Sequence, residues 1–179
     1  MKIHVLRLGH RPFRDQRITT HCSLVARAFG AEKMIYTGYK DNKLEVSISK
    51  VSTNFGGFFE IEYKKDWKKV IAEYKSNGWL VVHLTVYGLP IQSKIGKIRK
   101  MKKDIVIVIG GEKVPSEIYH LADFNISITP QPHSEVAALA IFLHEYFQGK
   151  ELNKDFAKAK IRIIPTKSGK KIESTKNQN

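Results

Sequence analysis

Residues 105–128 read IVIVIGGEKVPSEIYHLADFNISI, and this stretch decides the fold class. An unbroken apolar run, Ile105–Ile109, precedes two glycines and Pro115, and a second apolar run follows at Phe124–Ile128. Short apolar runs without alternation are typical of strands that are buried on both faces, as in a parallel sheet covered by helices. Residues 116–121, between the two runs, fit one short helix. The stretch therefore predicts strand, loop, helix and strand in an α/β arrangement.

The same alternation continues on both sides of this stretch. Periodicity predicts further strands at 2–8, 33–37, 58–63 and 79–84, and helices at about 15–29, 42–55, 67–76, 91–100 and 134–147. Asp41 and Asp66 stand where N-caps are needed, and Gly30 and the Asn77-Gly78 pair supply helix ends. We expect one α/β domain with a mostly parallel sheet and helices on both faces, because 179 residues suffice for one full hydrophobic core.

Charge points to a polyanionic partner. The chain has 31 Lys and Arg against 17 Asp and Glu, which leaves a formal charge of +14. Such an excess favours nucleic acid through counterion release and long-range attraction, although charge does not distinguish DNA from RNA. A lysine-rich surface of the kind found in heat-adapted proteins is the alternative.

Several other classes are disfavoured. No stretch approaches the roughly 20 apolar residues of a membrane span, and residues 1–8 alternate like a strand instead of resembling a signal peptide, so we expect a cytoplasmic protein with no membrane association. The one cysteine, Cys22, has no disulfide partner and no zinc-ligand spacing, so we expect no metal. The glycine and serine motifs of Rossmann enzymes, P-loop NTPases and α/β-hydrolases are absent from the sequence.

Three loops follow buried strands, at 83–90, 110–115 and 129–133, and in open parallel sheets this edge binds ligands. Gly110-Gly111 allows a close turn with exposed N–H groups, although such a turn is also a common structural connection. Ser134 either contacts a ligand or simply caps the last helix.

A loop near the N-terminus gathers guanidinium and imidazole groups at Arg7, His10, Arg11, Arg14, Arg17 and His21. Guanidinium groups bind phosphates through paired hydrogen bonds, so this loop is the best candidate for RNA contact. In the structural alternative, Asp15 caps the helix and pairs with an arginine, and His21 packs on the helix.

Three segments together carry a specific family resemblance: LRLGHR (6–11) with RDQRITTH (14–21), VIGGEKVP (108–115) and QPHSEVA (131–137). They resemble the three ordered motifs of the archaeal tRNA cytidine-56 2′-O-methyltransferases, which belong to the SPOUT class. The resemblance covers about residues 1–150. It implies a SPOUT fold with a C-terminal deep trefoil knot, a homodimer with the active site near the subunit interface, and S-adenosyl-L-methionine (SAM) held by the three loops.

The resemblance also implies a domain division. Residues 1–152 form the SPOUT methyltransferase domain, with the knot and the SAM site at about 79–148. From residue 153 to 179 the apolar pattern weakens apart from the run Ile161–Ile164, and we expect a C-terminal extension that ends in a basic, mobile tail.

The resemblance assigns residues to roles. Cofactor contacts fall on Leu84, Gly110, Gly111, Glu112, Lys113, Val114, Ile128, Thr129, Pro130, Gln131, Pro132, His133, Ser134 and Glu135. The motif-one arginine corresponds best to Arg17, with Arg14 and Arg11 as competitors, and Glu112 is the motif-two acid. His21 or His10 can take the proton, while Arg7, His10, Arg11 and Arg14 contact the tRNA. The Asn and Ser of related third motifs are replaced here by the run 132–135.

The reaction implied by the resemblance is in-line attack of the ribose O2′ of cytidine 56 on the SAM methyl group. Arginine has a pKa above about 12, so Arg17 is better suited to orienting O2′ and stabilising the developing alkoxide than to acting as a base. Two alternatives remain open from the residues alone: a non-catalytic basic RNA-binding protein, and a phosphate-ester enzyme with Gly110-Gly111 as an anion site and His133 as acid or base.

Overall fold

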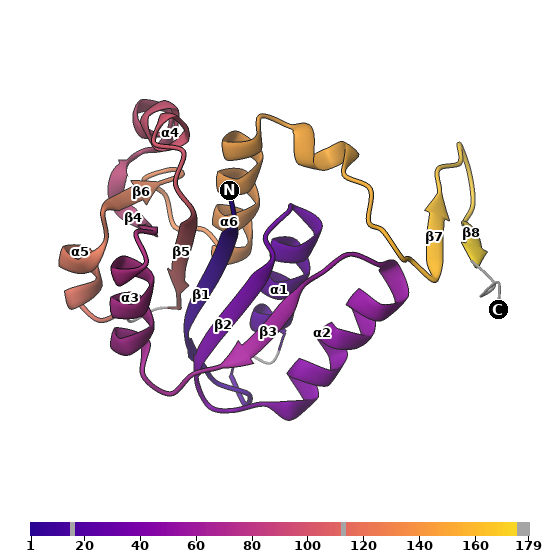
Figure 1. Ribbon diagram of the computed structural model, residues 1–179, viewed down its shortest axis with the longest axis horizontal. Coiled ribbons are helices and arrows are strands. Elements are labelled where there is room, and N and C mark those ends of the chain that lie inside the picture. The colour runs from indigo at the N-terminus through magenta and orange to yellow at the C-terminus, as the bar shows by residue number, and fades with distance from the viewer. Residues whose placement is uncertain (15–16, 112–113, 175–179) are drawn as a thin grey trace.

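Six parallel strands form the centre of the molecule in the order β3-β2-β1-β5-β4-β6 (Figure 1). The computed structural model describes residues 1–14, 17–111 and 114–174. The strands are β1 (Ile3–His10), β2 (Lys33–Gly38), β3 (Glu60–Tyr63), β4 (Leu80–Pro90), β5 (Ile105–Gly110) and β6 (Phe124–Ser127). Every pairing is parallel, so the carboxyl ends of all six strands lie at one edge.

Helices cover both faces of this sheet, as predicted. One face packs against α1 (Ile18–Ala28), α2 (Asn42–Phe55), α4 (Ile91–Lys100) and α6 (Glu135–Phe147), and the other against α3 (Trp67–Ser76) and α5 (Glu117–Leu121). In β5, Ile105, Ile107 and Ile109 face the first layer, whereas Val106 and Val108 face the second. The apolar run that decided the fold class is thus unbroken because both of its sides are buried.

Strand β4 is longer than predicted, and part of the expected loop at 83–90 lies within it. Leu84 and Leu89 both pair with Ile126, so residues 85–88 bulge between them. At Gly88 the two backbones nearly touch, since an added Cβ would lie 2.5 Å from the Ile126 carbonyl carbon. The bulged segment, Thr85-Val86-Tyr87-Gly88, interrupts the apolar run that ends at Leu84, so the sequence pattern marks the strand only up to that residue.

Other bounds differ by a few residues. Helix α1 begins at Ile18, with Arg17 at the N-cap position, where its side chain does not cap the helix. The expected start at Asp15 lies outside the described residues. Strand β3 begins at Glu60 instead of residue 58, because its pairing with β2 begins where Glu60 is opposite Lys33.

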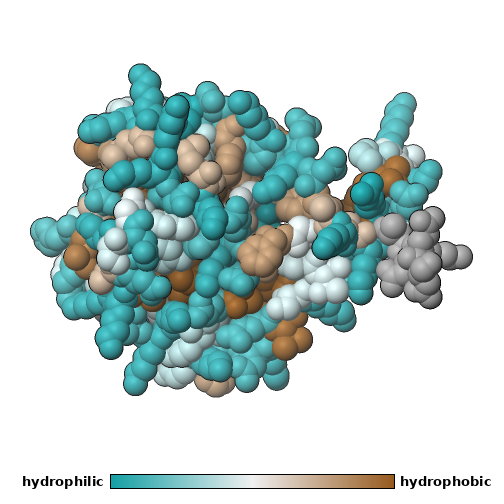
Figure 2. Space-filling view, viewed as in Figure 1, coloured by the Kyte–Doolittle hydropathy of each residue, from teal (hydrophilic) through white to brown (hydrophobic). Residues whose placement is uncertain are grey.

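The C-terminal extension is attached to the domain before it forms a hairpin. After the 3₁₀ turn η1 (Lys150–Asn153), the Gly57 N–H donates to Ala157 O at 2.8 Å, and the Arg27 guanidinium lies 4.6 Å from the centre of the Phe156 ring. Strands β7 (Ile161–Ile164) and β8 (Lys171–Ser174) then pair antiparallel and project from the body (Figure 1). The sequence did not predict β8, whose side chains are all exposed and therefore follow no burial pattern. Hydrophilic side chains cover most of the face in Figure 2, where the hairpin stands apart.

Candidate active site

A cavity of about 690 Å³ lies at the carboxyl edge of β4 and β5. Its walls come from segments far apart in the sequence: the end of β4, the glycine turn after β5, α5, and the loop that leads into α6. The lining residues are His83, Leu84, Thr85, Val86, Tyr87, Ile109, Gly110, Gly111, Val114, Tyr119, Pro132, His133, Glu135 and Ala138. The volume and the mix of aliphatic walls with a few polar groups suit a ligand of nucleoside size.

Gly110 lets the chain turn closely beside Val114. A Cβ on Gly110 would lie 2.6 Å from Val114 Cγ2, which is too close without a shift. The adjacent Gly111 lies beside Arg11, whose Nη2 would be 3.8 Å from an added Cβ. Glycine at 110 therefore sets the shape of this wall, and Arg11 stands at its rim.

His83 is held by its neighbours at the back of the cavity. Its Nδ1 lies 2.9 Å from Asn125 Oδ1, and the Asn125 amide donates to the Tyr119 carbonyl at 2.9 Å. Because that amide is fixed as a donor to Tyr119, Oδ1 faces His83 as an acceptor, and Nδ1 carries the proton. Burial lowers the pKa of His83, so the ring is neutral at pH 7.

Arg7 ties the central strand β1 to α6. Its side chain is 1% exposed, and Nη2 donates to Glu135 Oε1 at 3.1 Å. Within the described residues, its Nε and Nη1 have no hydrogen-bond partner. A buried guanidinium paired with Glu135 holds that carboxylate at the cavity wall.

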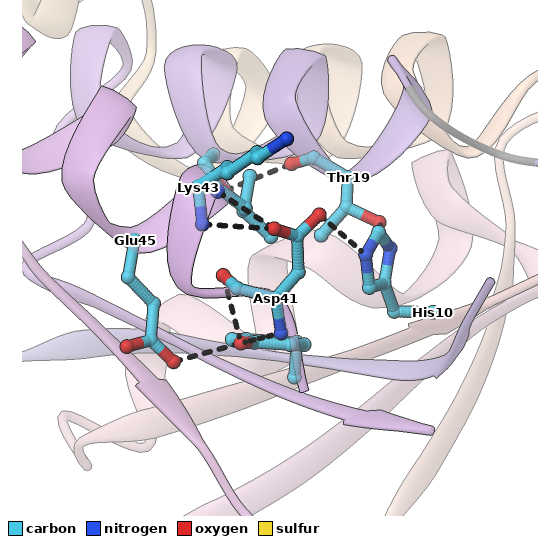
Figure 3. A network of polar contacts seen from close by, with 8 residues as sticks. His10, Thr19, Asp41, Lys43 and Glu45 are labelled. Carbon is cyan, nitrogen blue, oxygen red and sulfur yellow. Dashed lines mark hydrogen bonds and ion pairs between the residues drawn. The ribbon is translucent and has the colours of Figure 1, made fainter. Parts of the chain in front are cut away.

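His10 is fully buried under the loop after β1. Its Nδ1 lies 2.7 Å from Thr19 Oγ1 and its Nε2 lies 3.3 Å from Asp41 Oδ2 (Figure 3). Asp41 caps α2 by accepting from the N–H groups of Lys43 and Leu44 at 2.9 and 3.0 Å. Desolvation opposes ionisation of Asp41, but these N–H groups and the His10 ring together lower its pKa. The network joins the end of β1 to α1 and to the start of α2.

The burial of Arg7 and His10 corrects the expectation that they contact RNA. Both side chains are at most 1% exposed, and their partners are internal. Their positions assign them to supporting Glu135 and Asp41 instead.

The other predicted loop residues lie nearer the surface. Arg11 is half-buried at the cavity rim, Arg14 is exposed, and Arg17 and His21 are exposed at the start of α1. Neither Arg17 nor His21 is among the residues that line the cavity.

Half of the predicted cofactor contacts lie at the cavity. Those that line it are Leu84, Gly110, Gly111, Val114, Pro132, His133 and Glu135, whereas Ile128, Thr129, Pro130, Gln131 and Ser134 do not. Ser134 caps α6 by accepting from the Val136 N–H at 3.2 Å. Glu112 and Lys113 lie outside the described residues.

Sequence reasoning gave no individual role to seven lining residues: His83, Thr85, Val86, Tyr87, Ile109, Tyr119 and Ala138. The loop at 83–90 was expected at the ligand edge, and the strand-end rule alone places its first members there. Tyr119 on α5 and Ala138 on α6 belong to helix faces that look like ordinary core, so no pattern separates them from packing residues.

Comparison with known proteins identifies the family. The family model described as tRNA ribose 2′-O-methyltransferase, aTrm56, matches residues 55–173. A tRNA (cytidine(56)-2′-O)-methyltransferase of Thermococcus kodakarensis is 50% identical over 95% of this chain and 96% of its own length. The enzyme of the same name from Methanocaldococcus jannaschii is 52% identical over 96% of each chain. This chain belongs to the aTrm56 family.

Solved structures agree with the SPOUT-type fold of this aTrm56 chain. The TrmH/SpoU tRNA modifying enzyme of A. aeolicus superposes with a TM-score of 0.65 at 19% identity, over 84% of this chain and 76% of that one. The SpoU methyltransferase AviRb from Streptomyces viridochromogenes, solved in complex with AdoMet, gives 0.61 at 15% identity over 82% of this chain and 57% of that one. At these identities the similarity shows the fold alone.

Two further observations bear on the nature of the aTrm56 site. Across residues 1–14, 17–111 and 114–174, no three His, Cys, Asp or Glu side chains come together to hold a metal ion. Among the same residues, no helix is long and apolar enough to cross a membrane.

Proposed function

We propose that this chain methylates the ribose 2′-hydroxyl of cytidine 56 in tRNA, with SAM as methyl donor. One observation carries the proposal: relatives named for this reaction are about half identical to it over nearly the whole of both chains. The glycine turn and the loop before α6, which carry two of the family motifs, meet at the cavity. We place the activity in the cytoplasm, with tRNA as the partner.

The cavity fits SAM. Leu84, Val86 and Val114 offer aliphatic surface to an adenosine, and Gly110 lets the backbone approach closely. The carboxylate of Glu135 offers an acceptor to the ammonium or ribose groups. When bound, SAM supplies a methyl group activated by its sulfonium. The full set of residues that we propose to hold it is Leu84, Gly110–Val114 and Ile128–Glu135.

The chain's own residues must orient O2′ and handle its proton. We propose that Arg17 orients the hydroxyl and stabilises the negative charge that develops on it, with Glu112 as a further catalytic group and His21 as the proton acceptor. Arg11 and Arg14 contact tRNA phosphates from the same loop.

A homodimer accounts for the distance between these groups and the cavity. Arg17 and His21 are exposed and do not line the cavity of their own protomer. We propose that the loop of one subunit completes the site of its partner, as expected for an active site near the subunit interface.

Transfer of labelled methyl from SAM to an unmodified tRNA transcript tests the function. The matched control is a transcript with 2′-deoxycytidine at position 56, which lacks the accepting oxygen and keeps the base. Loss of transfer with this substrate alone is expected. No transfer to either RNA despite tight binding would instead support a non-catalytic RNA-binding protein.

The role of Arg17 has its own test. An Arg17→Ala protein is expected to bind SAM and tRNA but to lose at least about a hundredfold in turnover, the order of loss for one group that stabilises a developing oxyanion. Normal turnover with intact binding of both ligands would remove Arg17 from the mechanism and leave Arg11 and Arg14 as the candidates.

A further inference from the structure

A second cavity of about 690 Å³ lies between the loop after β1 and the start of α2. Among the residues that the structure describes, none lines both this cavity and the one at Gly110. Its walls are Pro12, Phe13, Arg17, Thr20, Lys40, Asp41, Asn42, Lys43, Leu44 and Ser47. It opens at the carboxyl ends of β1 and β2, the same edge of the sheet as the first cavity.

The walls of this cavity are cationic. Arg17, Lys40 and Lys43 are all exposed there. Asp41 also lines it, but its Oδ1 accepts from two N–H groups of α2 and its Oδ2 faces His10 (Figure 3). Because its carboxylate is engaged in this way, the three cations favour an anionic ligand.

An exposed aromatic ring stands at the mouth of the cavity. The Phe13 side chain is 93% exposed, although a phenyl ring is normally buried. An aromatic face beside a groove of lysine and arginine is the arrangement by which proteins hold single-stranded nucleic acid, with a base stacked on the ring and the phosphates on the cations.

The floor of the cavity is held in place. Asp41 is fixed by α2 and by His10, and His10 is fixed in turn by Thr19 at 2.7 Å. Thr20 and Lys43, which are neighbours of these fixed residues, line the walls. A site held in this way loses less conformational entropy when its ligand binds.

We propose that this second cavity binds a nucleotide of the RNA substrate that flanks the methylated one, with its base stacked on Phe13 and its phosphates on Lys40 and Lys43. The inference rests on the proposed function for the identity of the RNA. Among the described residues, the cavity shares no lining residue with the one that we assign to SAM, but Arg17, which we assign to the reacting O2′, lies in its wall. The occupant is therefore a nucleotide next to the reacting one.

A fluorescent variant tests the stacking. Phe13→Trp places an indole at the mouth of the cavity, and a stacked base is expected to quench its emission when unmodified tRNA transcript is added. Phe58→Trp is the matched control, because Phe58 is also exposed, at 69%, and lines neither of these two cavities. Equal responses of the two variants, or none from Phe13→Trp at saturating tRNA, would overturn the proposal.

Kinetics separate a flanking nucleotide from the reacting one. Because Phe13 is exposed, Phe13→Ala is expected to fold normally, to raise KM for tRNA about tenfold, and to leave kcat within about twofold and SAM affinity unchanged. A fall in kcat with unchanged KM would place the reacting nucleotide on Phe13 and contradict the inference.

Salt dependence tests the cations. The double variant Lys40→Ala/Lys43→Ala is expected to weaken tRNA binding and to reduce the slope of log K against log salt by about two. Lys100→Ala/Lys103→Ala removes the same charge at the opposite edge of the sheet, before β5, and is expected to leave the slope unchanged. Equal losses in both double variants would show a general charge effect and overturn the site.

These outcomes are separate from those of the proposed function. If the wild-type protein transfers methyl groups but the Phe13 and lysine variants bind tRNA normally, only this inference fails. If no methyl transfer occurs, quenching and salt slopes still decide whether the cavity binds RNA.

Discussion

Gly110 has room for a hydrogen atom on its α-carbon but not for a methyl group. A Gly110→Ala variant would push against Val114 Cγ2, which can move at a strain cost of about 1 kcal/mol or more. Val114 lines the cavity, so we expect SAM affinity to fall about tenfold in a protein that still folds, as measured by calorimetric titration.

Gly96→Ala is the control, because a Cβ there meets open space in α4. It should stabilise the fold by roughly 0.5–1 kcal/mol and leave SAM binding unchanged. Unchanged affinity in Gly110→Ala would contradict this view of the turn.

His4 makes stability depend on pH. Desolvation, with Lys33 and Lys2 nearby, lowers its pKa from 6.5 to about 4, and Nδ1 lies 2.7 Å from the Tyr74 hydroxyl. The unfolded chain therefore takes up a proton before the folded one does. The contribution of the neutral, buried His4 ring to the free energy of unfolding is therefore fully present above pH 6.5, and it is lost as the pH falls towards 4.

A non-titrating variant checks the assignment to His4. In thermal unfolding at pH 7, 5.5 and 4.5, His4→Gln should lose less stability across this range than the wild type. Parallel decreases in the two proteins would mean that other groups control the acid response.

Individual residues were predictable where backbone geometry demands a residue type. Gly110 and the cap at Ser134 follow from turn and helix chemistry, which is local. His83 was not predicted, because its role depends on Asn125 and Tyr119, which come from distant parts of the chain. The burial of Arg7 could not be predicted from the sequence either, because its partner Glu135 lies on another element.

At the scale of elements, two helices begin with the same cap but in different surroundings. Asp66 accepts from the N–H groups of Lys68 and Lys69, as Asp41 does at α2, but only Asp41 also faces a buried histidine. Asp66→Ala should cost about 1 kcal/mol in the free energy of unfolding. Asp41→Ala should cost about 2–3 kcal/mol, because it also leaves His10 Nε2 buried without that partner. Equal losses in urea denaturation would mean that the contact with His10 contributes nothing.

The elements most accurately predicted are those with a strong burial pattern. Strand β5 and helices α2, α3 and α4 matched closely, because apolar spacing marks all four in the sequence and aspartate caps also mark α2 and α3. Strand β8 and the bulged part of β4 were not predicted. The side chains of β8 are all exposed and the backbone of β4 is irregular at the bulge, so neither segment has a periodic pattern of apolar residues.

At the scale of the whole molecule, the extension divides into an attached part and a projecting hairpin. Residues 156–160 contact α1 and α2 through the Phe156 ring and through two backbone hydrogen bonds, from Gly57 to Ala157 and from Lys160 to Asn54. Removing 161–179 should therefore change the melting temperature by about 2 °C or less. Removing 154–179 should lower it by about 5 °C or more, because these contacts are lost. Similar melting temperatures for the two truncations would show that the attached part does not support the domain.

The strand order has a consequence for how the molecule forms. Strand β1 pairs on one side with β2, which follows soon after it, but on the other side with β5, where Ile3 is opposite Ile105. In a nascent chain, the edge of β1 that pairs with β5 therefore stays unpaired until residues beyond 105 have been synthesised. Closing so long a loop is entropically costly, so folding is slow and waits for the second half of the chain. Until then the edge of β1 is open to pairing with other chains, which makes this period the one in which aggregation competes with folding.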